Sequence, residues 1–297
     1  MKSLAIISKK YKADAWQAGQ SLQAWFASRG LAARHLENEP EPDISPLPPG
    51  TEFIVVLGGD GTILSVARHY GRLGLPILGV NMGGLGFLTE ISLEDLYPCL
   101  EEHVLPGKFE VDERMILSVS LIRGRETVCR ENVLNDAVIN KGALARIAEL
   151  TTWIDGEYLT TYRADGLIVS TSTGSTAYTM SAGGPIAYPT LGTIILLPIC
   201  PHTLSNRPLI LPETVTVAVT LDEKDEKVQD LYLTLDGQVG RGLKPRDRLE
   251  VRSGDYHVKL VKHPRRSHFE ILRTKLGWGE LGGALPVKER FSVFGFR

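Results

Sequence analysis

The stretch that decides the fold is Phe53-Ile54-Val55-Val56-Leu57-Gly58-Gly59-Asp60-Gly61-Thr62. Its first five residues are apolar without polar alternation, which is typical of a parallel strand buried on both faces. The glycines permit a tight turn and let a ligand approach the backbone closely. Residues 62–70 can continue as an amphipathic helix. Strand, turn and helix start together predict an anion site, because unpaired N–H groups and the positive end of the helix dipole face the turn.

A carboxylate is an unexpected residue in an anion site. Bound phosphates would repel Asp60 unless a metal ion or a proton transfer involves it. The simpler alternative is that Gly-Gly-Asp-Gly is only a tight turn, in which aspartate and glycine are common. The rest of the chain has to decide between these two interpretations.

Length and composition exclude several classes of protein. The chain has 297 residues, enough for two domains, with 43% hydrophobic and 23% charged residues and a formal net charge of −2. That balance argues against an extended nucleic-acid surface, which would need a basic excess. The longest apolar run, residues 194–200, is too short to span a bilayer, and the N-terminus does not resemble a signal peptide.

The cysteines and histidines do not indicate a metal site. The three cysteines, Cys99, Cys129 and Cys200, are widely spaced, which is typical of free thiols in a reducing cytoplasm. No cluster of cysteine and histidine has the spacing of metal ligands. We therefore expect a cytoplasmic protein without a metal site built from its own side chains.

Strands and helices alternate in the first third of the chain. A helix is expected over residues 14–30, and further strands over residues 4–8, 31–36 and 76–80. Alternation of this kind is typical of a sheet whose faces are covered by helices. It predicts an open α/β domain over residues 1–105.

Short strands dominate the rest of the chain. They predict a mainly antiparallel, β-sandwich-like domain over residues 106–274. Asp155-Gly156 between two apolar segments predicts a hairpin. Residues 248–252 and 258–261 are expected to be two separate strands. The last residues, 275–297, are expected to return and complete the first domain.

Polar or glycine-rich segments interrupt the expected strands at three further places. The glycine-rich residues 81–88 follow a buried strand, so they form either a bend or a ligand loop at the carboxyl edge of the sheet. Asn135 and Asp136 are poor strand formers within an apolar strand. They are either satisfied in the core or exposed to a ligand. Asp236-Gly237 is most simply a hairpin turn.

The richest cluster is a hydroxyl-rich turn after the strand at residues 166–171. Its residues are Thr173, Gly174, Ser175, Thr176, Ala177 and Tyr178, and a short helix is expected over residues 176–181. Hydroxyl and backbone N–H groups suit phosphates or ribose hydroxyls, although a capped helix start would use the same residues. The chain lacks a P-loop signature, and its first strand lacks the glycine fingerprint of Rossmann dehydrogenases. Two ligand-like loops from different domains fit a transferase that holds two substrates in a cleft.

Taken together, these motifs resemble those of the bacterial NAD kinases. The Gly-Gly-Asp-Gly turn alone is shared with diacylglycerol kinases, sphingosine kinases and 6-phosphofructokinases. The resemblance rests on the combination of motifs, which runs in order through nearly the whole chain: residues 57–62, 79–88, 134–136, 162–185, 201–208 and 236–238. It implies an N-terminal α/β domain joined to a C-terminal β-sandwich-like domain.

The resemblance also implies a reaction. The γ-phosphoryl of ATP, or a phosphoryl of polyphosphate in some members, would move to the 2′-hydroxyl of the NAD adenosine ribose, giving NADP. Asp60 would accept the proton of that hydroxyl. Mg²⁺ or another divalent cation would be held mainly through the nucleotide phosphates. The candidate binding residues for ATP and NAD are Gly58, Gly59, Gly61, Thr62, Asn135, Asp136, Arg146, Arg163, Asp165, Thr173, Gly174, Ser175, Thr176, Ala177, Tyr178, Ser181 and Gln238.

The resemblance further implies a homodimer or homotetramer, with no nucleic-acid or membrane partner. Two alternatives stay open. A lipid kinase of the same superfamily would share the glycine turn, but it would need an apolar substrate channel and gives no role to Asn135-Asp136 or to the hydroxyl-rich turn. A non-catalytic NADP(H)-binding sensor would be favoured by loss of the acceptor carboxylate, and Asp60 is present.

Overall fold

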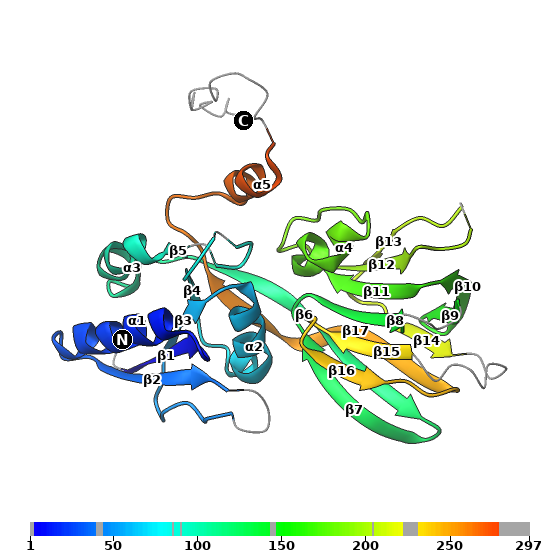
Figure 1. Ribbon diagram of the computed structural model, residues 1–297, viewed down its shortest axis with the longest axis horizontal. Coiled ribbons are helices and arrows are strands. Elements are labelled where there is room, and N and C mark those ends of the chain that lie inside the picture. The colour runs from blue at the N-terminus through cyan, green and yellow to red at the C-terminus, as the bar shows by residue number, and fades with distance from the viewer. Residues whose placement is uncertain are drawn as a thin grey trace, which may run out of the picture.

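The structure, a computed structural model, describes residues 3–39, 44–84, 86–89, 91–142, 147–203, 205–221 and 231–278. Arg146, one of the predicted site residues, lies outside the described residues, and so does most of the segment 275–297 that was expected to return to the first domain. Within the described part, strands and helices alternate up to about residue 104, and strands dominate the part that follows (Figure 1). Both features agree with the expected order of elements.

The first half is a parallel sheet with helices packed on it. Its elements are β1 (Ser3–Lys9), α1 (Ala13–Ala27), β2 (Ala32–Asn38), β3 (Phe53–Gly58), α2 (Asp60–Tyr70), a 3₁₀ helix (Gly71–Leu73), β4 (Ile77–Asn81), β5 (Ile91–Ser92) and α3 (Leu93–Cys99), which continues as a π-helix (Leu100–Val104). The strand order is β2-β1-β3-β4, all parallel, with β5 beside β4. Every residue of β3 is buried, which confirms the strand predicted at residues 53–57.

The second half is an antiparallel β-sandwich. One layer contains β6 (Val111–Arg123), β7 (Glu126–Val133), β9 (Ala148–Ile154), β10 (Glu157–Ala164), β14 (Val217–Leu221) and β17 (Asp247–Val261). The other contains β8 (Asp136–Lys141), β11 (Gly166–Thr171), β12 (Thr193–Ile199), β13 (Leu209–Pro212), β15 (Leu231–Leu235) and β16 (Val239–Gly242). Buried residues of both layers form one core, in which Val119 of β6 belongs with Leu167 of β11 and Leu233 of β15. The predicted fold class is therefore confirmed.

The strand β17 corrects one expectation. Residues 248–252 and 258–261 were expected to be separate strands, but they belong to one strand of 15 residues whose pairing with β6 shifts between Ser253 and His257. A bulge of this kind bends a strand without ending it. Beyond the bulge, Leu260 pairs in parallel with Ile77 of β4. One 11-stranded sheet therefore runs through both halves of the molecule.

Several turns lie where the sequence predicts them. Asp155 and Gly156 have positive φ angles of 50° and 85° and connect β9 to β10, which confirms that hairpin. The helix expected over residues 14–30 ends at Ala27, and Gly30 follows it with a φ of 72°. No helix of the described residues is long and apolar enough to cross a membrane.

The helix expected over residues 176–181 is shorter and broken. A 3₁₀ helix covers Thr173–Thr176, and α4 covers only Tyr178–Ser181. The break lies at Ala177, whose φ of −96° and ψ of −127° fit neither helix. After β17, α5 (His268–Leu276) begins at a Ser267 cap and is seen above both sheets in Figure 1.

Candidate functional site

Asp60 is the first residue of α2. The helix was expected to start at Thr62, but it starts two residues earlier because the Gly59 carbonyl accepts bonds from the N–H groups of Thr62 and Ile63, at 2.9 and 3.3 Å. An acidic residue in the first turn is favourable at the positive end of the helix dipole. Gly58 has no room for a side chain, because a Cβ there would collide with Thr62. The glycine turn therefore places Asp60 at the carboxyl end of the buried strand β3.

The glycine-rich segment after β4 packs against the Asp60 carboxylate. Oδ2 accepts a hydrogen bond from the Phe87 N–H at 2.8 Å. Oδ1 accepts from the N–H groups of Leu88 and Thr89 and from the Thr89 hydroxyl, each at 3.1 Å. A Cβ on Gly86 would collide with this carboxylate. The segment that the sequence marks as a bend or a ligand loop thus holds Asp60 in one orientation.

Asn81, the last residue of β4, holds this segment in turn. Its Nδ2 donates to the Gly84 carbonyl at 2.6 Å and to the Thr89 hydroxyl at 3.0 Å, and its Oδ1 accepts from the Gly83 N–H at 2.6 Å. A carboxylate offers about four lone-pair sites. Three donors share Oδ1 of Asp60 and one binds Oδ2. Among the described residues, Oδ2 therefore accepts one hydrogen bond and keeps a further acceptor site.

Asn135 and Asp136 lie in the second half, where β8 begins. Their N–H groups and that of Leu134 donate to the Asp236 carboxylate at 2.7, 3.3 and 3.2 Å. Asp136 is only 3% exposed. Burial, and then the charge of Asp236, raise the pKa of Asp136 from 3.8 to about 7. Burial also raises the pKa of Asp236, while its N–H donors and Arg68 oppose that rise.

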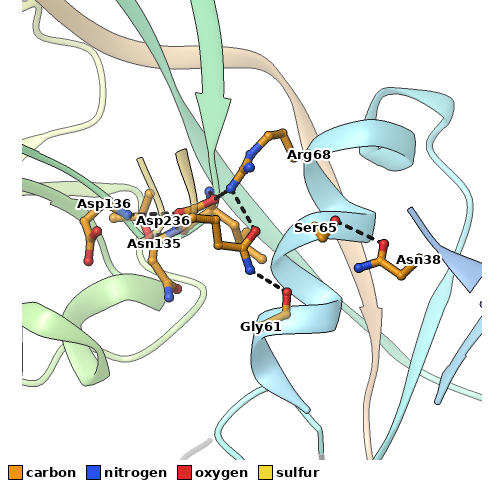
Figure 2. Close-up of polar contacts among 10 residues, drawn as sticks. Asn38, Gly61, Ser65, Arg68, Asn135, Asp136 and Asp236 are labelled. Carbon is orange, nitrogen blue, oxygen red and sulfur yellow. Dashed lines mark hydrogen bonds and ion pairs between the residues drawn. The ribbon is translucent and has the colours of Figure 1, made fainter. Parts of the chain in front are cut away.

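Arg68 and Gln238 join the two halves of the molecule (Figure 2). Nη2 of Arg68 lies 3.3 Å from Oδ2 of Asp236 and donates to Oε1 of Gln238 at 3.1 Å. Nε2 of Gln238 donates to the Gly61 carbonyl at 2.6 Å. Asp236 does form the expected hairpin turn between β15 and β16. Sequence reasoning missed its second role, and it missed Arg68, because an Asp-Gly turn looks the same whether its carboxylate is buried or exposed.

The end of β11 and the hydroxyl-rich turn after it support the backbone at Asn135. The Ser170 hydroxyl donates to the Asn135 carbonyl at 3.1 Å, and the Thr171 hydroxyl donates to the Leu134 carbonyl at 2.6 Å. A Cβ on Gly174 would collide with the same Asn135 carbonyl. These groups therefore fix the backbone at Leu134 and Asn135.

The members of this turn differ in exposure. Thr173 and Ser175 are buried, and the Ser175 hydroxyl bonds to the backbone of Ala187. Thr176 and Ala177 are half-buried, whereas Tyr178 is 43% exposed. The turn thus leaves Ala177 and Tyr178 accessible, whereas the hydroxyls of Ser175 and Thr176 bond to backbone groups.

Two cavities are lined by eight of the predicted residues. The α2 cavity, of about 520 Å³, is lined by the predicted residues Gly59, Gly61, Thr62 and Gln238, and also by Lys9, Lys10 and Arg68. The β8 cavity, of about 200 Å³, is lined by the predicted residues Asn135, Asp136, Ala177 and Tyr178, and also by Asp236 and Gly237. The cationic side chains and the helix start make the α2 cavity suitable for a polyanion.

Cavity volume alone would point elsewhere. A third cavity, of about 560 Å³, lies around the start of α5 and is lined by Tyr188, Lys262 and His268 among others, but by none of the predicted site residues. We assign the site by chemistry, because the neighbours of Asp60, Gly59 and Gly61, line the α2 cavity and the buried Asp136 lines the β8 cavity. Within the described part of the chain, no group of three His, Cys, Asp or Glu side chains could hold a metal ion.

Several predicted residues line neither cavity, and three of them belong to β10, to the residue after it and to α4. Arg163 forms an ion pair with Glu149 at 3.1 Å, and Asp165 forms one with Lys141 at 3.3 Å. Ser181 is exposed at the end of α4. None of these three lines the α2 or the β8 cavity as the described residues form them. Their participation in NAD binding stays a prediction.

The fold and the site together define a nucleotide-binding phosphotransferase with an α/β half and a β-sandwich half. Two protein-family models match the chain, the ATP-NAD kinase N-terminal domain over residues 41–109 and the ATP-NAD kinase C-terminal domain over residues 134–263. The chain belongs to the ATP-NAD kinase family.

Curated relatives and solved structures agree with this family. An NAD kinase of Geobacter sulfurreducens is 51% identical over 287 residues, covering 94% of this chain and 100% of that protein. An NAD kinase of Geotalea daltonii is 47% identical with the same coverage. The crystal structure of a yeast NADH kinase complexed with NADH superposes with a TM-score of 0.83 at 25% identity, covering 97% of this chain and 90% of that one. An NAD kinase from Archaeoglobus fulgidus in complex with ATP shares the fold, with a TM-score of 0.71 at 24% identity and coverage of 92% and 97%.

Proposed function

We propose that the chain transfers the γ-phosphoryl of ATP to the 2′-hydroxyl of the adenosine ribose of NAD, with Asp60 as the base. The observation that carries this proposal is the Asp60 carboxylate, which four donors hold at the start of α2 while Oδ2 keeps a site for a hydroxyl. A ribose hydroxyl is a poor nucleophile until a base takes its proton, and a positioned base contributes about 10²–10⁴-fold. Relatives named NAD kinase support the choice of acceptor.

The phosphoryl donor is assigned to the α2 cavity. Its lysines and the free N–H groups at the start of α2 offer positive charge to a triphosphate. Lys10 is already paired with Glu39, so Lys9 and the glycine backbone carry much of this interaction. A divalent cation, Mg²⁺ in our proposal, would be held through the phosphates, where it supplies charge neutralisation. An activity assay with polyphosphate in place of ATP measures whether polyphosphate can serve as the donor.

The NAD acceptor is assigned to the β8 cavity. The side chains of Asn135 and Asp136 offer donors and acceptors of the kind that pair with ribose hydroxyls. The exposed ring of Tyr178 offers an apolar face to a base. Asp60 is linked to this site through its neighbour Gly61. The Gly61 carbonyl accepts a hydrogen bond from Gln238, which belongs to the same turn as the lining residues Asp236 and Gly237.

The family resemblance supports further proposals about the whole protein. We propose that it works in the cytoplasm as a homodimer or homotetramer, with residues 1–105 and 275–297 as one domain and residues 106–274 as the other. The change from a parallel sheet to an antiparallel sandwich near residue 105 supports that boundary. Because β17 pairs with β4, the two proposed domains share one sheet.

The first test is an activity assay with Asp60→Asn. Purified protein is incubated with NAD, ATP and Mg²⁺, and NADP⁺ is read through an NADP-specific dehydrogenase. The variant keeps the size and most hydrogen bonds of the side chain but cannot accept a proton, so turnover should fall by about 10²–10⁴-fold with NAD affinity nearly unchanged. Asp255→Asn, which changes an exposed aspartate paired with Arg72, should retain wild-type turnover.

Other outcomes of this assay decide between the remaining classes. Near-normal turnover in Asp60→Asn would remove Asp60 from the mechanism. A wild-type protein that binds NAD but forms no NADP⁺ with ATP or polyphosphate would be a non-catalytic sensor. A wild-type protein that does not bind NAD would point to the lipid kinase.

A further inference from the structure

A buried ion pair crosses between the two halves of the molecule. Arg68 belongs to the last turns of α2, and Asp236 belongs to the turn between β15 and β16. Nη2 and Oδ2 are 3.3 Å apart, and the two side chains are only 7% and 0% exposed. Burying such a pair costs desolvation that its attraction often fails to recover, so burial alone is weak support for a stabilising role. Its position suggests another role.

Each member of the pair lines a different cavity. Arg68 lines the α2 cavity, assigned above to the phosphoryl donor. Asp236 lines the β8 cavity, assigned above to NAD. The ion pair therefore belongs to the walls of both cavities. Nε of Arg68 is buried and has no hydrogen-bond partner among the described residues, so Nη2 makes the contacts to the turn between β15 and β16.

The turn between β15 and β16 binds backbone groups of both halves of the molecule. The Asp236 carboxylate accepts bonds from the N–H groups of Asn135 and Asp136, at 2.7 and 3.3 Å. Gln238, two residues further on, donates to the Gly61 carbonyl at 2.6 Å. Arg68 binds both Asp236 and Gln238 (Figure 2). A single turn is thus connected to the residue after Asp60 and to the acceptor pair.

We propose that Arg68, Asp236 and Gln238 are positioning residues that set the distance between Asp60 and the Asn135-Asp136 pair. This inference rests on the proposed function. Phosphoryl transfer depends mainly on alignment, and a misplacement of about 1 Å can cost about 100-fold in rate. Loss of the connection should therefore lower kcat, while each substrate still binds its own cavity.

The test compares Arg68→Met/Asp236→Asn with Arg72→Ala. The double variant removes both buried charges, so neither is left unpaired. The control removes an ion pair between Arg72 and Asp255 that also joins the two halves, but whose side chains are 62% and 67% exposed and line neither cavity. We expect kcat per folded molecule to fall by about 10–100-fold in the double variant, with both KM values within about threefold. The control should stay within about twofold of the wild type.

Two further variants separate positioning from folding. Arg68→Lys keeps a charge beside Asp236, so it should recover much of the lost kcat. Gln238→Ala changes an exposed side chain, so it should lower kcat while the thermal midpoint stays near that of the wild type. This second variant tests the proposal even where the double variant does not fold.

The results distinguish this inference from the proposed function. A wild-type protein that forms no NADP⁺ overturns both. An active wild type, with the double variant and Gln238→Ala no slower than Arg72→Ala, overturns the positioning role alone. A fall in kcat that follows only the loss of folded protein, measured by circular dichroism, also overturns it.

Discussion

Asp60 and Asp136 are both aspartates, but their surroundings prepare them for different tasks. Four donors orient Asp60 beside a cavity suited to phosphates. Asp136 is buried next to a second carboxylate, Asp236, and this raises its pKa to about 7. At neutral pH Asp136 therefore exchanges its proton readily, so the β8 cavity can offer a ribose either an acceptor or a donor.

The raised pKa of Asp136 predicts how stability depends on pH. The folded state binds more protons than the unfolded state between pH 3.8 and about 7, so the free energy of unfolding decreases as pH rises through this window. Asp136→Asn removes the titrating carboxyl group, and with it this decrease in the free energy of unfolding. At about pH 8 the variant should be more stable, by up to about 4 kcal/mol.

Chemical denaturation at two pH values measures this effect. At about pH 4 the wild type is protonated and the difference should nearly vanish. The variant should also bind NAD more weakly, because an amide cannot replace a carboxylate acceptor. Equal stability of the two proteins at both pH values would contradict the raised pKa of Asp136.

At the scale of elements, the segment between β4 and β5 works with α2 as one unit. Asn81 holds the segment, and Phe87 and Thr89 of the segment hold Asp60. Close packing at Gly86 makes this contact possible, because a Cβ there would collide with the carboxylate. The orientation of the Asp60 carboxylate therefore depends on this loop.

Gly86→Ala tests this dependence. The added methyl group must displace either the loop or the carboxylate, so turnover should fall by about 100-fold, with NAD affinity within about threefold. Gly84→Ala is a matched control in the same loop, because a Cβ there would meet nothing within 4 Å. Steady-state kinetics and NAD titration measure both variants. Equal turnover in the two variants would show that turnover does not depend on the close packing of Gly86 against Asp60.

At the scale of the whole molecule, the two halves share both a sheet and a hydrophobic cluster. β17 pairs with β6 and β14 in the sandwich and with β4 in the α/β half. One cluster of buried residues contains Ile63 and Val66 of α2 together with Ile116 of β6 and Val258 of β17. Contacts of this kind couple the unfolding of two domains.

We therefore expect the two halves to unfold in one transition. Leu233→Ala removes a fully buried side chain of the sandwich core, and Leu22→Ala removes a fully buried side chain of α1 in the core of the α/β half. Each should cost about 2–5 kcal/mol. Each should also shift the entire melting curve, whether it is followed by far-UV circular dichroism or by tryptophan fluorescence. Two transitions, of which each variant shifts only one, would contradict this coupling.

Much of the fold and part of the site follow from the sequence, because they depend on neighbouring residues. The unbroken apolar run at residues 53–57 requires a strand buried on both faces, and the glycines after it require a turn. Asp155-Gly156 requires a hairpin, because both residues take positive φ angles at low cost. Asp60 is identifiable for the same reason, since a carboxylate in a predicted anion site is chemically unusual.

Only the tertiary structure decides what lies opposite these motifs. Arg68 and Asp236 are 168 positions apart, and no local sequence pattern predicts their contact. The continuity of β17 depends on its partners β6 and β4, which hold the strand together through its bulge. Local conformation follows from backbone sterics and side-chain preferences, which the sequence by itself determines. The buried ion pair and the two cavities result from packing between distant segments, which only the folded chain brings together.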